Sequence, residues 1–140
     1  MLPSHLILIK RRRFKLELYQ RVGNQYALQH KCRIAVGAVG FTTPAGPHIV
    51  TAKARNPDWV MPNSAWVPEE LRGTRVLGTD PANPIKEAFL RLTTDGVGIH
   101  GTDNLLSLRS RASHGCIRTS PEDAVTLYRL VPVGTPVVVS

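Results

Sequence analysis

A chain of 140 residues with 42% hydrophobic residues has the size of one compact domain and enough apolar side chains for a single core, so a second domain is not expected. Its 11 glycines and 11 prolines are spread along the sequence, which excludes a low-complexity linker and is typical of a strand-and-turn fold. Two cysteines are too few for a disulfide framework, and no stretch is apolar for long enough to cross a membrane. We therefore expect one domain over residues 1–140 with two free thiols.

The net charge of +8 comes from 18 basic and 10 acidic residues, and its densest cluster is K-R-R-R-F-K at residues 10–15. A basic run that contains an aromatic residue is compatible with binding to nucleic acid or to an anionic surface. Apolar residues flank the run with the alternation of strands, however, and charge clusters in folded domains are usually solvated, so we favour an exposed hairpin turn. No nucleic-acid-binding motif accompanies the charge, and we expect no nucleic-acid partner.

Alternating apolar residues predict three strands in the first part of the chain. They cover residues 5–9, 13–20 and 27–36, with a turn at residues 23–24 between the second and the third. Strands with such short connections are expected to form a meander. Cys32 lies in the third strand, where an isolated cysteine is usually a small packing residue.

A fourth predicted strand, over residues 48–54, is followed by a long segment without periodicity. Prolines recur from residue 56 to residue 83, and neither a helical nor a strand-like pattern continues there. Long irregular loops in compact domains are often functional, so Trp59, Met61 and Trp66 are candidates for one wall of a substrate groove. The alternative, which the sequence leaves open, is that the two tryptophans cap a hydrophobic edge.

The remaining elements are two short strands and one helix. Residues 88–92 and 98–100 are predicted to be strands joined by a turn at residues 93–96. A helix is predicted over residues 120–130, because Ser120 can cap it, a proline follows at the first helical position, and apolar residues recur with helical spacing. The chain is therefore expected to be mainly β with one helix.

The segment S-H-G-C-I-R at residues 113–118, together with I-H-G-T at residues 99–102, contains the groups of a thiol-dependent active site. Cys116 can act as a nucleophile, because a neighbouring imidazolium or arginine lowers the pKa of a thiol. Gly115 leaves room for a substrate carbonyl and allows backbone N–H groups to face a developing oxyanion.

Two histidines are candidates for the general base. His100 lies in a separate predicted strand and could reach the sulfur across the site, whereas His114 is two residues from Cys116. Side chains at i and i+2 of an extended segment point the same way, so geometry leaves both candidates open. The three histidines outside these segments are interpreted as hydrogen-bonded structural residues.

These segments resemble the signature of the L,D-transpeptidases of bacterial cell walls, the YkuD-type domains. The family signature is a His-Gly followed, after a dozen or more residues, by Ser/Thr-His-Gly-Cys, a hydrophobic residue and Asn or Arg. Residues 43–46, T-P-A-G, resemble the family's Thr-Pro-x-Gly turn, and residues 133–137, V-G-T-P-V, resemble its closing strand. The resemblance covers the chain from about residue 5 to its end.

The resemblance implies a mainly β, YkuD-like sandwich or barrel of mixed sheets, with one helix after the loop that carries Cys116. It implies that Cys116 is the nucleophile and His100 its base, and that the backbone carbonyl of Gly101 orients the base. His114 is then a supporting residue that positions the loop. The oxyanion is expected to be held by the N–H groups of Gly115 and Cys116.

Arg118 is the expected clamp for a substrate carboxylate, since a guanidinium binds a carboxylate through two parallel hydrogen bonds. Ser113, Trp59 and Trp66 complete the residues expected on the substrate side. The implied reaction is attack of Cys116 on the L-centre carbonyl of the diamino acid in a peptidoglycan tetrapeptide stem, which releases D-alanine and leaves a thioester. An amine from a second stem then forms a 3→3 cross-link, whereas water or a lipoprotein lysine as acceptor gives a carboxypeptidase or an anchoring enzyme.

This reaction requires no metal and no organic cofactor. A zinc site built from His100, His114 and Cys116 is the metal alternative, but the sequence lacks the Cys-x-x-Cys or His-Glu-x-x-His spacing of such sites. A catalytically silent wall-binding domain is a further alternative. The substrate implied by the family lies outside the cytoplasm, so we expect an extracytoplasmic location, although residues 1–9 do not have the pattern of a secretory signal.

Overall fold

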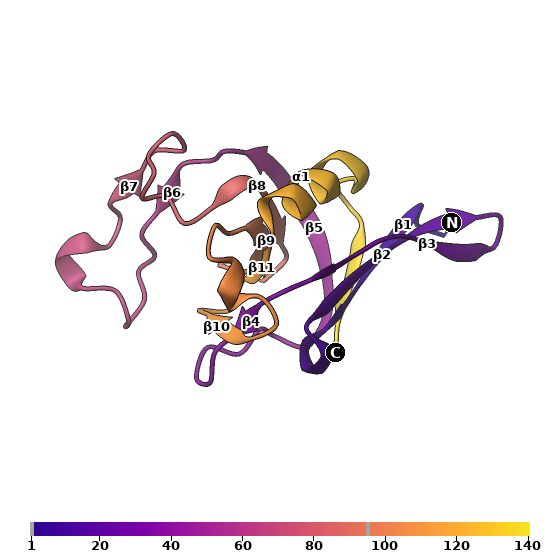
Figure 1. Cartoon of the computed structure of the whole chain (residues 1–140), viewed down its shortest axis with the longest axis horizontal. Helices are drawn as coiled ribbons and strands as arrows, with labels where there is room; N and C mark the ends of the chain where they lie inside the picture. Colours follow the sequence, from indigo (N-terminus) through magenta and orange to yellow (C-terminus); the bar gives the residue numbers. More distant parts are fainter. Residues whose placement is uncertain (1, 95) are drawn as a thin grey trace.

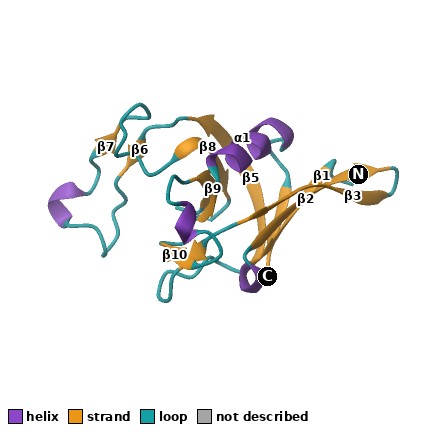
Figure 2. Ribbon diagram, viewed as in Figure 1, coloured by secondary structure: helices purple, strands orange, loops and turns teal. Residues whose placement is uncertain are grey.

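The computed structural model describes residues 2–94 and 96–140 and has a mainly β fold with one α-helix (Figures 1 and 2). Its strands are β1 His5–Lys10, β2 Lys15–Val22, β3 Gln25–Arg33, β4 Val36–Gly37, β5 Gly46–Arg55, β6 Trp59–Val60, β7 Arg75–Val76, β8 Lys86–Leu92, β9 Gly98–Gly101, β10 Arg111–Ser113, β11 Ile117–Thr119 and β12 Pro136–Val139. Its helices are α1 Pro121–Leu130 and the short 3₁₀ helices η1 Arg11–Arg13, η2 Glu69–Leu71 and η3 Leu105–Ser107. No helix in these two stretches of chain is long and apolar enough to cross a membrane.

Eight strands form one mixed sheet in the order β11-β9-β8-β5-β12-β1-β2-β3. β1 pairs with β12 and β9 pairs with β11 in parallel, while the other neighbours are antiparallel. The two ends of this order meet, because Ala35, just after β3, exchanges two backbone hydrogen bonds of 2.9 and 3.0 Å with Arg118 in β11. The sheet therefore closes on itself, and the predicted mainly β fold with mixed sheets and one helix is confirmed.

The core is made of alternate strand residues that are fully buried. Aliphatic side chains from seven strands and from α1 form it: Ile7, Ile9, Leu16, Leu18, Val50, Leu90, Leu92, Ile99, Ile117, Leu127, Val137 and Val139. Complete burial of one such side chain is worth about 1.5–3 kcal/mol, so this cluster is the main source of stability. The same alternation turns the intervening residues of β9 and β11 away from the core.

Helix α1 begins one residue after its capping serine, as the sequence predicts. The Ser120 Oγ accepts a hydrogen bond from the Asp123 N–H at 3.1 Å, and Pro121 occupies the first helical position, where a missing N–H costs nothing. Glu122 and Asp123 place carboxylates at the positive end of the helix dipole. The helix packs against β8 and β9 and follows β11 directly, so it supports the strand that carries Arg118.

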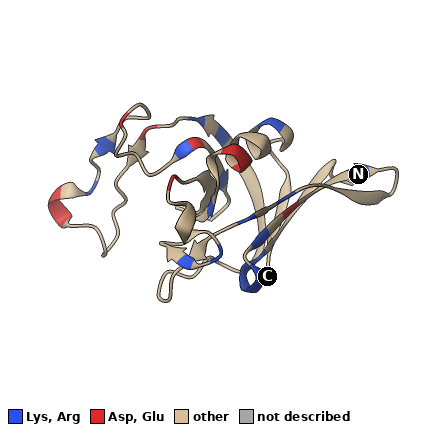
Figure 3. Ribbon diagram, in the orientation of Figure 1, with Lys and Arg blue, Asp and Glu red and all other residues tan. Residues whose placement is uncertain are grey.

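Two strand boundaries differ from the prediction because of the basic hairpin. The residues of η1 form a 3₁₀ turn and Phe14 has a left-handed φ of 53°, so β2 starts at Lys15 rather than at residue 13. β3 ends at Arg33 rather than at residue 36, because Arg33 pairs with Lys15, the first residue of β2; the Ile34 N–H still bonds to the Phe14 carbonyl in the same register. Two of the three arginines of η1 are exposed, so the basic run is the solvated hairpin turn that the sequence favours (Figure 3).

Residues 56–83 form the predicted excursion, an arm that leaves the body of the fold and carries β6 and β7 (Figure 1). The sequence did not predict that β6 and β7 pair as an antiparallel ribbon, since each has only two residues. The Asn83 side chain closes the base of the arm: it donates to the Pro57 carbonyl at 3.0 Å and accepts from the Ile85 N–H at 2.9 Å. Asn83 is 1% exposed, so this buried amide fixes where the arm returns to the fold.

Candidate active site

Strands β9 and β11 bring the two halves of the motif together as parallel neighbours. Their register pairs Ile99 with Ile117 and His100 with Arg118. The two isoleucines are fully buried in the core, so strand alternation turns His100 and Arg118 to the opposite face. A candidate base and a guanidinium therefore lie side by side.

His100 is held as a neutral imidazole in one tautomer. Its Nδ1 lies 2.8 Å from the Gly101 carbonyl, the contact that the resemblance implies, and because a carbonyl only accepts, Nδ1 carries the proton and Nε2 keeps its lone pair. Burial lowers the pKa of His100 to about 4; the hydrogen bond to Gly101 opposes this lowering, and the Arg118 charge adds to it. The ring is therefore uncharged at neutral pH and available as a base.

Cys116 is a protonated thiol, which corrects the prediction of a lowered pKa. Burial raises the pKa of this thiol above its ordinary value, and the Gly98 N–H and the Arg118 charge offset the effect only in part. The prediction was wrong because burial has a larger effect on the pKa of this thiol than the Arg118 charge has. The Sγ donates to the Gly96 carbonyl at 3.4 Å, and no hydrogen bond joins it to His100 in the part of the chain that the structure describes. The thiol therefore needs a base to remove its proton during attack.

The Ser113 hydroxyl ties the loop of residues 113–116 together. Ser113 is 2% exposed, and its Oγ donates to the Cys116 carbonyl at 2.5 Å and accepts from the Gly115 N–H at 3.2 Å. The structure shows these contacts of Ser113 within the loop, and its expected contact with substrate stays a prediction. Of the two N–H groups expected at the oxyanion, that of Gly115 is engaged by this serine. Gly115 has a φ of +120°, which residues with a side chain rarely adopt, so the loop requires glycine here.

Thr43 fastens this loop to the rest of the fold. Its Oγ1 donates to the Gly115 carbonyl at 2.8 Å and accepts from the Gly37 N–H at 2.9 Å. Thr43 is 1% exposed, and its own carbonyl accepts from Arg11 Nη1 at 2.9 Å, which links the loop to the basic hairpin. In the sequence, Thr43 is recognisable only as part of a Thr-Pro turn, and no pattern predicts its contact with the cysteine loop.

Comparisons with known proteins agree with this geometry. The sequence profile of a family described as L,D-transpeptidase catalytic domain, YkuD, matches residues 4–139. The chain belongs to this family. YqjB of Bacillus subtilis, which carries an L,D-transpeptidase name, is 34% identical over 112 residues, which are 76% of this chain and 57% of that relative.

Solved L,D-transpeptidases share the fold of this YkuD-type domain. One from Mycobacterium smegmatis matches it with a TM-score of 0.75 at 24% identity, covering 98% of this chain and 58% of the other. The catalytic domain of an E. faecium L,D-transpeptidase, determined in the form acylated by ertapenem, matches with a TM-score of 0.71 at 22% identity and covers 100% of this chain and 99% of the other. The chain therefore spans little more than half the length of the Bacillus and M. smegmatis proteins.

In this YkuD-type domain, the arm reaches the cysteine loop through one tryptophan. Trp66 stacks on His114 with ring centroids 3.8 Å apart and planes 9° from parallel, and Phe41 meets the same imidazole edge-on at 4.7 Å. Partial desolvation lowers the pKa of His114 below its ordinary value, and the Arg118 charge adds to the lowering. Trp59 lies in β6, and no aromatic contact joins it to the loop within the described residues, so its place in a substrate groove stays a prediction. No motif in the sequence predicts the contact of Phe41 with His114.

The second thiol has a different environment. Burial, with a smaller contribution from the Asp123 carboxylate, raises the pKa of Cys32 to about 12, which makes it a poor nucleophile at neutral pH. The histidines outside the motif are hydrogen-bonded, as expected: His5 with Ser4, His30 with Asp123, and His48 with the Pro44 carbonyl. Across residues 2–94 and 96–140, His100, His114 and Cys116 do not come close enough together to share a metal ion.

Proposed function

We propose that this domain is a cysteine-dependent L,D-transpeptidase that acts on the tetrapeptide stems of peptidoglycan. The observation that carries the proposal is the neutral His100 imidazole, with Nδ1 held by Gly101 and Nε2 unprotonated, beside Arg118 in the strand that follows Cys116. Membership of the L,D-transpeptidase family supports the reaction class. In this assignment Cys116 is the nucleophile, His100 the general base and His114 a support for the loop.

The proposed first half-reaction forms a thioester on Cys116. His100 Nε2 takes the thiol proton as Sγ bonds to the L-centre carbonyl carbon of the diamino acid, and the Cys116 N–H is the donor for the resulting oxyanion. When the carbonyl re-forms, the bond to the nitrogen of the terminal D-alanine breaks and the imidazolium returns the proton to that amine. A neutral imidazole and a neutral thiol are compatible with this order of steps, because the proton is transferred as the sulfur attacks.

The proposed second half-reaction transfers the stem to an acceptor. An amine of a neighbouring stem attacks the thioester, its proton passes by way of His100 to the departing sulfur, and a 3→3 cross-link forms. Water as acceptor makes the enzyme an L,D-carboxypeptidase, and a lipoprotein lysine makes it an anchoring enzyme. All three outcomes share the same first half-reaction. We propose the stem amine as the acceptor, and the products distinguish it from the other two.

Arg118 is the proposed clamp for a carboxylate of the donor stem. Its guanidinium takes part in none of the ion pairs formed within the described residues, while its charge acts on both His100 and Cys116. The side chain is half-buried, which strengthens a charge-assisted hydrogen bond relative to one in open water. Trp66, stacked on His114, is the proposed neighbouring wall of the groove.

The proposed place of action is outside the cytoplasm, because the stems lie in the cell wall. The net charge of +8 suits residence in an anionic wall. The alternative from a different class is a catalytically silent domain that binds the wall without forming a thioester.

Incubation with defined muropeptides followed by mass spectrometry tests the proposal. We expect release of D-alanine and formation of cross-linked dimers. With ertapenem, the compound that acylates the similar E. faecium domain, we expect one adduct, on the peptide that contains Cys116 rather than on the one that contains Cys32. An adduct on Cys32 alone would contradict the assignment of the nucleophile, and binding to wall material with neither product nor adduct would support the silent domain.

A further inference from the structure

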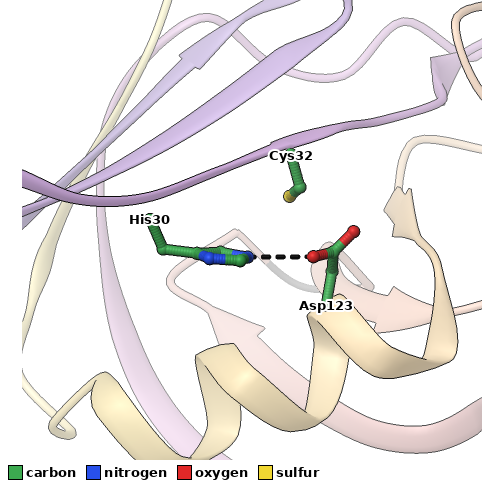
Figure 4. Close-up of side chains that lie close together, drawn as sticks. All are labelled: His30, Cys32 and Asp123. Carbon is green, nitrogen blue, oxygen red and sulfur yellow. Dashed lines mark hydrogen bonds and ion pairs between the residues drawn. The ribbon is translucent and has the colours of Figure 1, made fainter.

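A second cluster of reactive side chains lies between the meander and the helix. His30 and Cys32 are two residues apart on β3, and both point toward the first turn of α1, where Asp123 lies (Figure 4). The His30 Nε2 is 2.9 Å from the Asp123 Oδ1, and one nitrogen, the sulfur and one carboxylate oxygen all lie within 4.8 Å of one another. Three metal-binding groups thus converge from two elements that are distant in sequence.

The spacing of these three atoms is close to that around a tetrahedral ion. Zinc bonds of about 2.0–2.3 Å place neighbouring ligand atoms about 3.3–3.7 Å apart. The contact between His30 and Asp123 therefore has to lengthen by less than about 1 Å, and the Cys32 sulfur has to approach by about 1 Å. Rotation about side-chain bonds is sufficient for shifts of this size.

The types of ligand and their charges select the metal. A thiolate and an imidazole are preferred by zinc and by cobalt, its spectroscopic substitute, whereas magnesium and calcium prefer oxygen ligands throughout. One thiolate from Cys32 and one carboxylate from Asp123 neutralise a divalent ion, and His30 adds a neutral third ligand. The thiol proton is released to solvent when the metal binds.

The surroundings orient one ligand and provide access for a fourth. The Ser120 Oγ donates to the Asp123 Oδ2 at 2.8 Å, which fixes the carboxylate with its Oδ1 toward His30. A surface depression of about 470 Å³ opens at Cys32 and Asp123 and is also lined by Ser120 and Leu108. Water from this depression can complete four-coordination.

We propose that His30, Cys32 and Asp123 form a structural zinc site that joins β3 to the first turn of α1. None of its ligands belongs to the cysteine loop or to the proposed reaction. A test of the zinc site is therefore independent of the proposed function. A metal ion at this position would stabilise the fold near β11, because α1 follows β11 directly. An ion at this place clamps the strand that carries Arg118 to the meander on the other side of the closed sheet.

Titration of the reduced, chelator-treated chain with Co²⁺ tests the proposal. We expect a thiolate-to-cobalt charge-transfer band and the intense visible bands of tetrahedral cobalt, at one ion per chain, and we expect Zn²⁺ to displace them. Cys32→Ser should abolish the charge-transfer band, whereas Cys116→Ser, which removes the other thiol, should leave it unchanged. At a hundredfold excess over its dissociation constant, Zn²⁺ should raise the unfolding midpoint of the wild type and of Cys116→Ser by at least about 5 °C, but not that of Cys32→Ser.

Two further variants keep the test decisive if Cys32→Ser does not fold. His30→Gln and Asp123→Asn retain the thiol, so each should keep a weakened charge-transfer band and lower the Co²⁺ affinity by at least about tenfold. A wild-type chain that binds no cobalt overturns the proposal and leaves the three side chains as a packing contact. A band that disappears in Cys116→Ser and persists in Cys32→Ser also overturns it, because the ion then lies at the cysteine loop.

Discussion

His100 and Arg118 lie opposite each other on the parallel strands β9 and β11, and the positive charge of the one disfavours a positive charge on the other. The same guanidinium is the proposed anchor for a carboxylate of the donor stem. A carboxylate paired with Arg118 offsets its charge, which raises the pKa of His100 toward the ordinary value and makes it a stronger base. In the proposed reaction, binding of the donor stem thus makes His100 a stronger base.

The burial of His100 predicts that the domain loses stability in mild acid. The unfolded imidazole binds a proton near pH 6.5, whereas the folded one does so only near pH 4, so between these values the unfolded chain binds more protons. The free energy of unfolding should therefore fall by up to about 1.4 kcal/mol for each pH unit of acidification in this range. Urea denaturation at pH 6.5 and at pH 5 measures the slope, and His100→Gln should reduce it; an equal slope in that variant would show that other groups are responsible.

Replacement of each motif histidine should distinguish the general base from the residue that supports the loop. General-base assistance is typically worth about 10²–10⁴-fold, so His100→Ala should slow acylation by a factor in that range. His114→Ala should cost less than about tenfold, because it removes the stack with Trp66 but no proton acceptor for the thiol. Single-turnover acylation of the folded variants measures both. His114→Phe is the matched control that keeps the ring stack, and a loss larger at position 114 than at 100 would transfer the base role to His114.

Arg118→Lys should impair the enzyme although it keeps the positive charge. A charge-assisted hydrogen bond is worth roughly 1.5–3 kcal/mol, so loss of one prong of the clamp should lower turnover of the carboxylate-bearing stem by about one to two orders of magnitude. Because lysine retains the charge beside His100, the change should not act through the pKa of the base. An amidated stem serves as the control: wild type and variant should process it alike, and equal losses on both stems would refute the clamp.

Thr43→Val should weaken both the fold and the reaction. Valine has nearly the same shape but leaves the buried Gly115 carbonyl and Gly37 N–H without their partner, at a cost of about 1–3 kcal/mol for each group. The Gly115 carbonyl precedes Cys116, so the nucleophile should also lose its position. Thr43→Ser keeps the hydroxyl and is the control. Denaturant unfolding together with single-turnover acylation measures the effects, and identical behaviour of the two variants would argue against the hydrogen bonds.

The elements that the sequence predicted well are those with a local physical signal. Apolar alternation predicted the strands that contain Ile7, Ile9, Leu16 and Leu18, which the structure buries in the core, and a serine followed by a proline predicted the start of α1. The two motif segments, which the sequence places together only by resemblance, do meet, because parallel pairing of β9 and β11 brings them into register.

What the sequence could not predict depends on burial and on distant partners. The pKa of Cys116 moves upward rather than downward because burial in the folded domain outweighs the Gly98 N–H and the Arg118 charge, which lower it. The engagement of Ser113 within its own loop, the contact of Thr43 with Gly115 and the approach of Phe41 to His114 all join residues whose proximity no spacing rule expresses.

The backbone pairing of Ala35 with Arg118 has a consequence for how the chain folds. These residues are about 80 positions apart, and the entropy of closing so long a loop must be met before their contact contributes stability. We therefore expect this bridge between the two edges of the sheet to form late, after strand pairs that are closer in sequence, such as β9 with β11. Closure of the sheet is in this sense a cooperative property of the folded domain, because it needs both edges of the sheet in place.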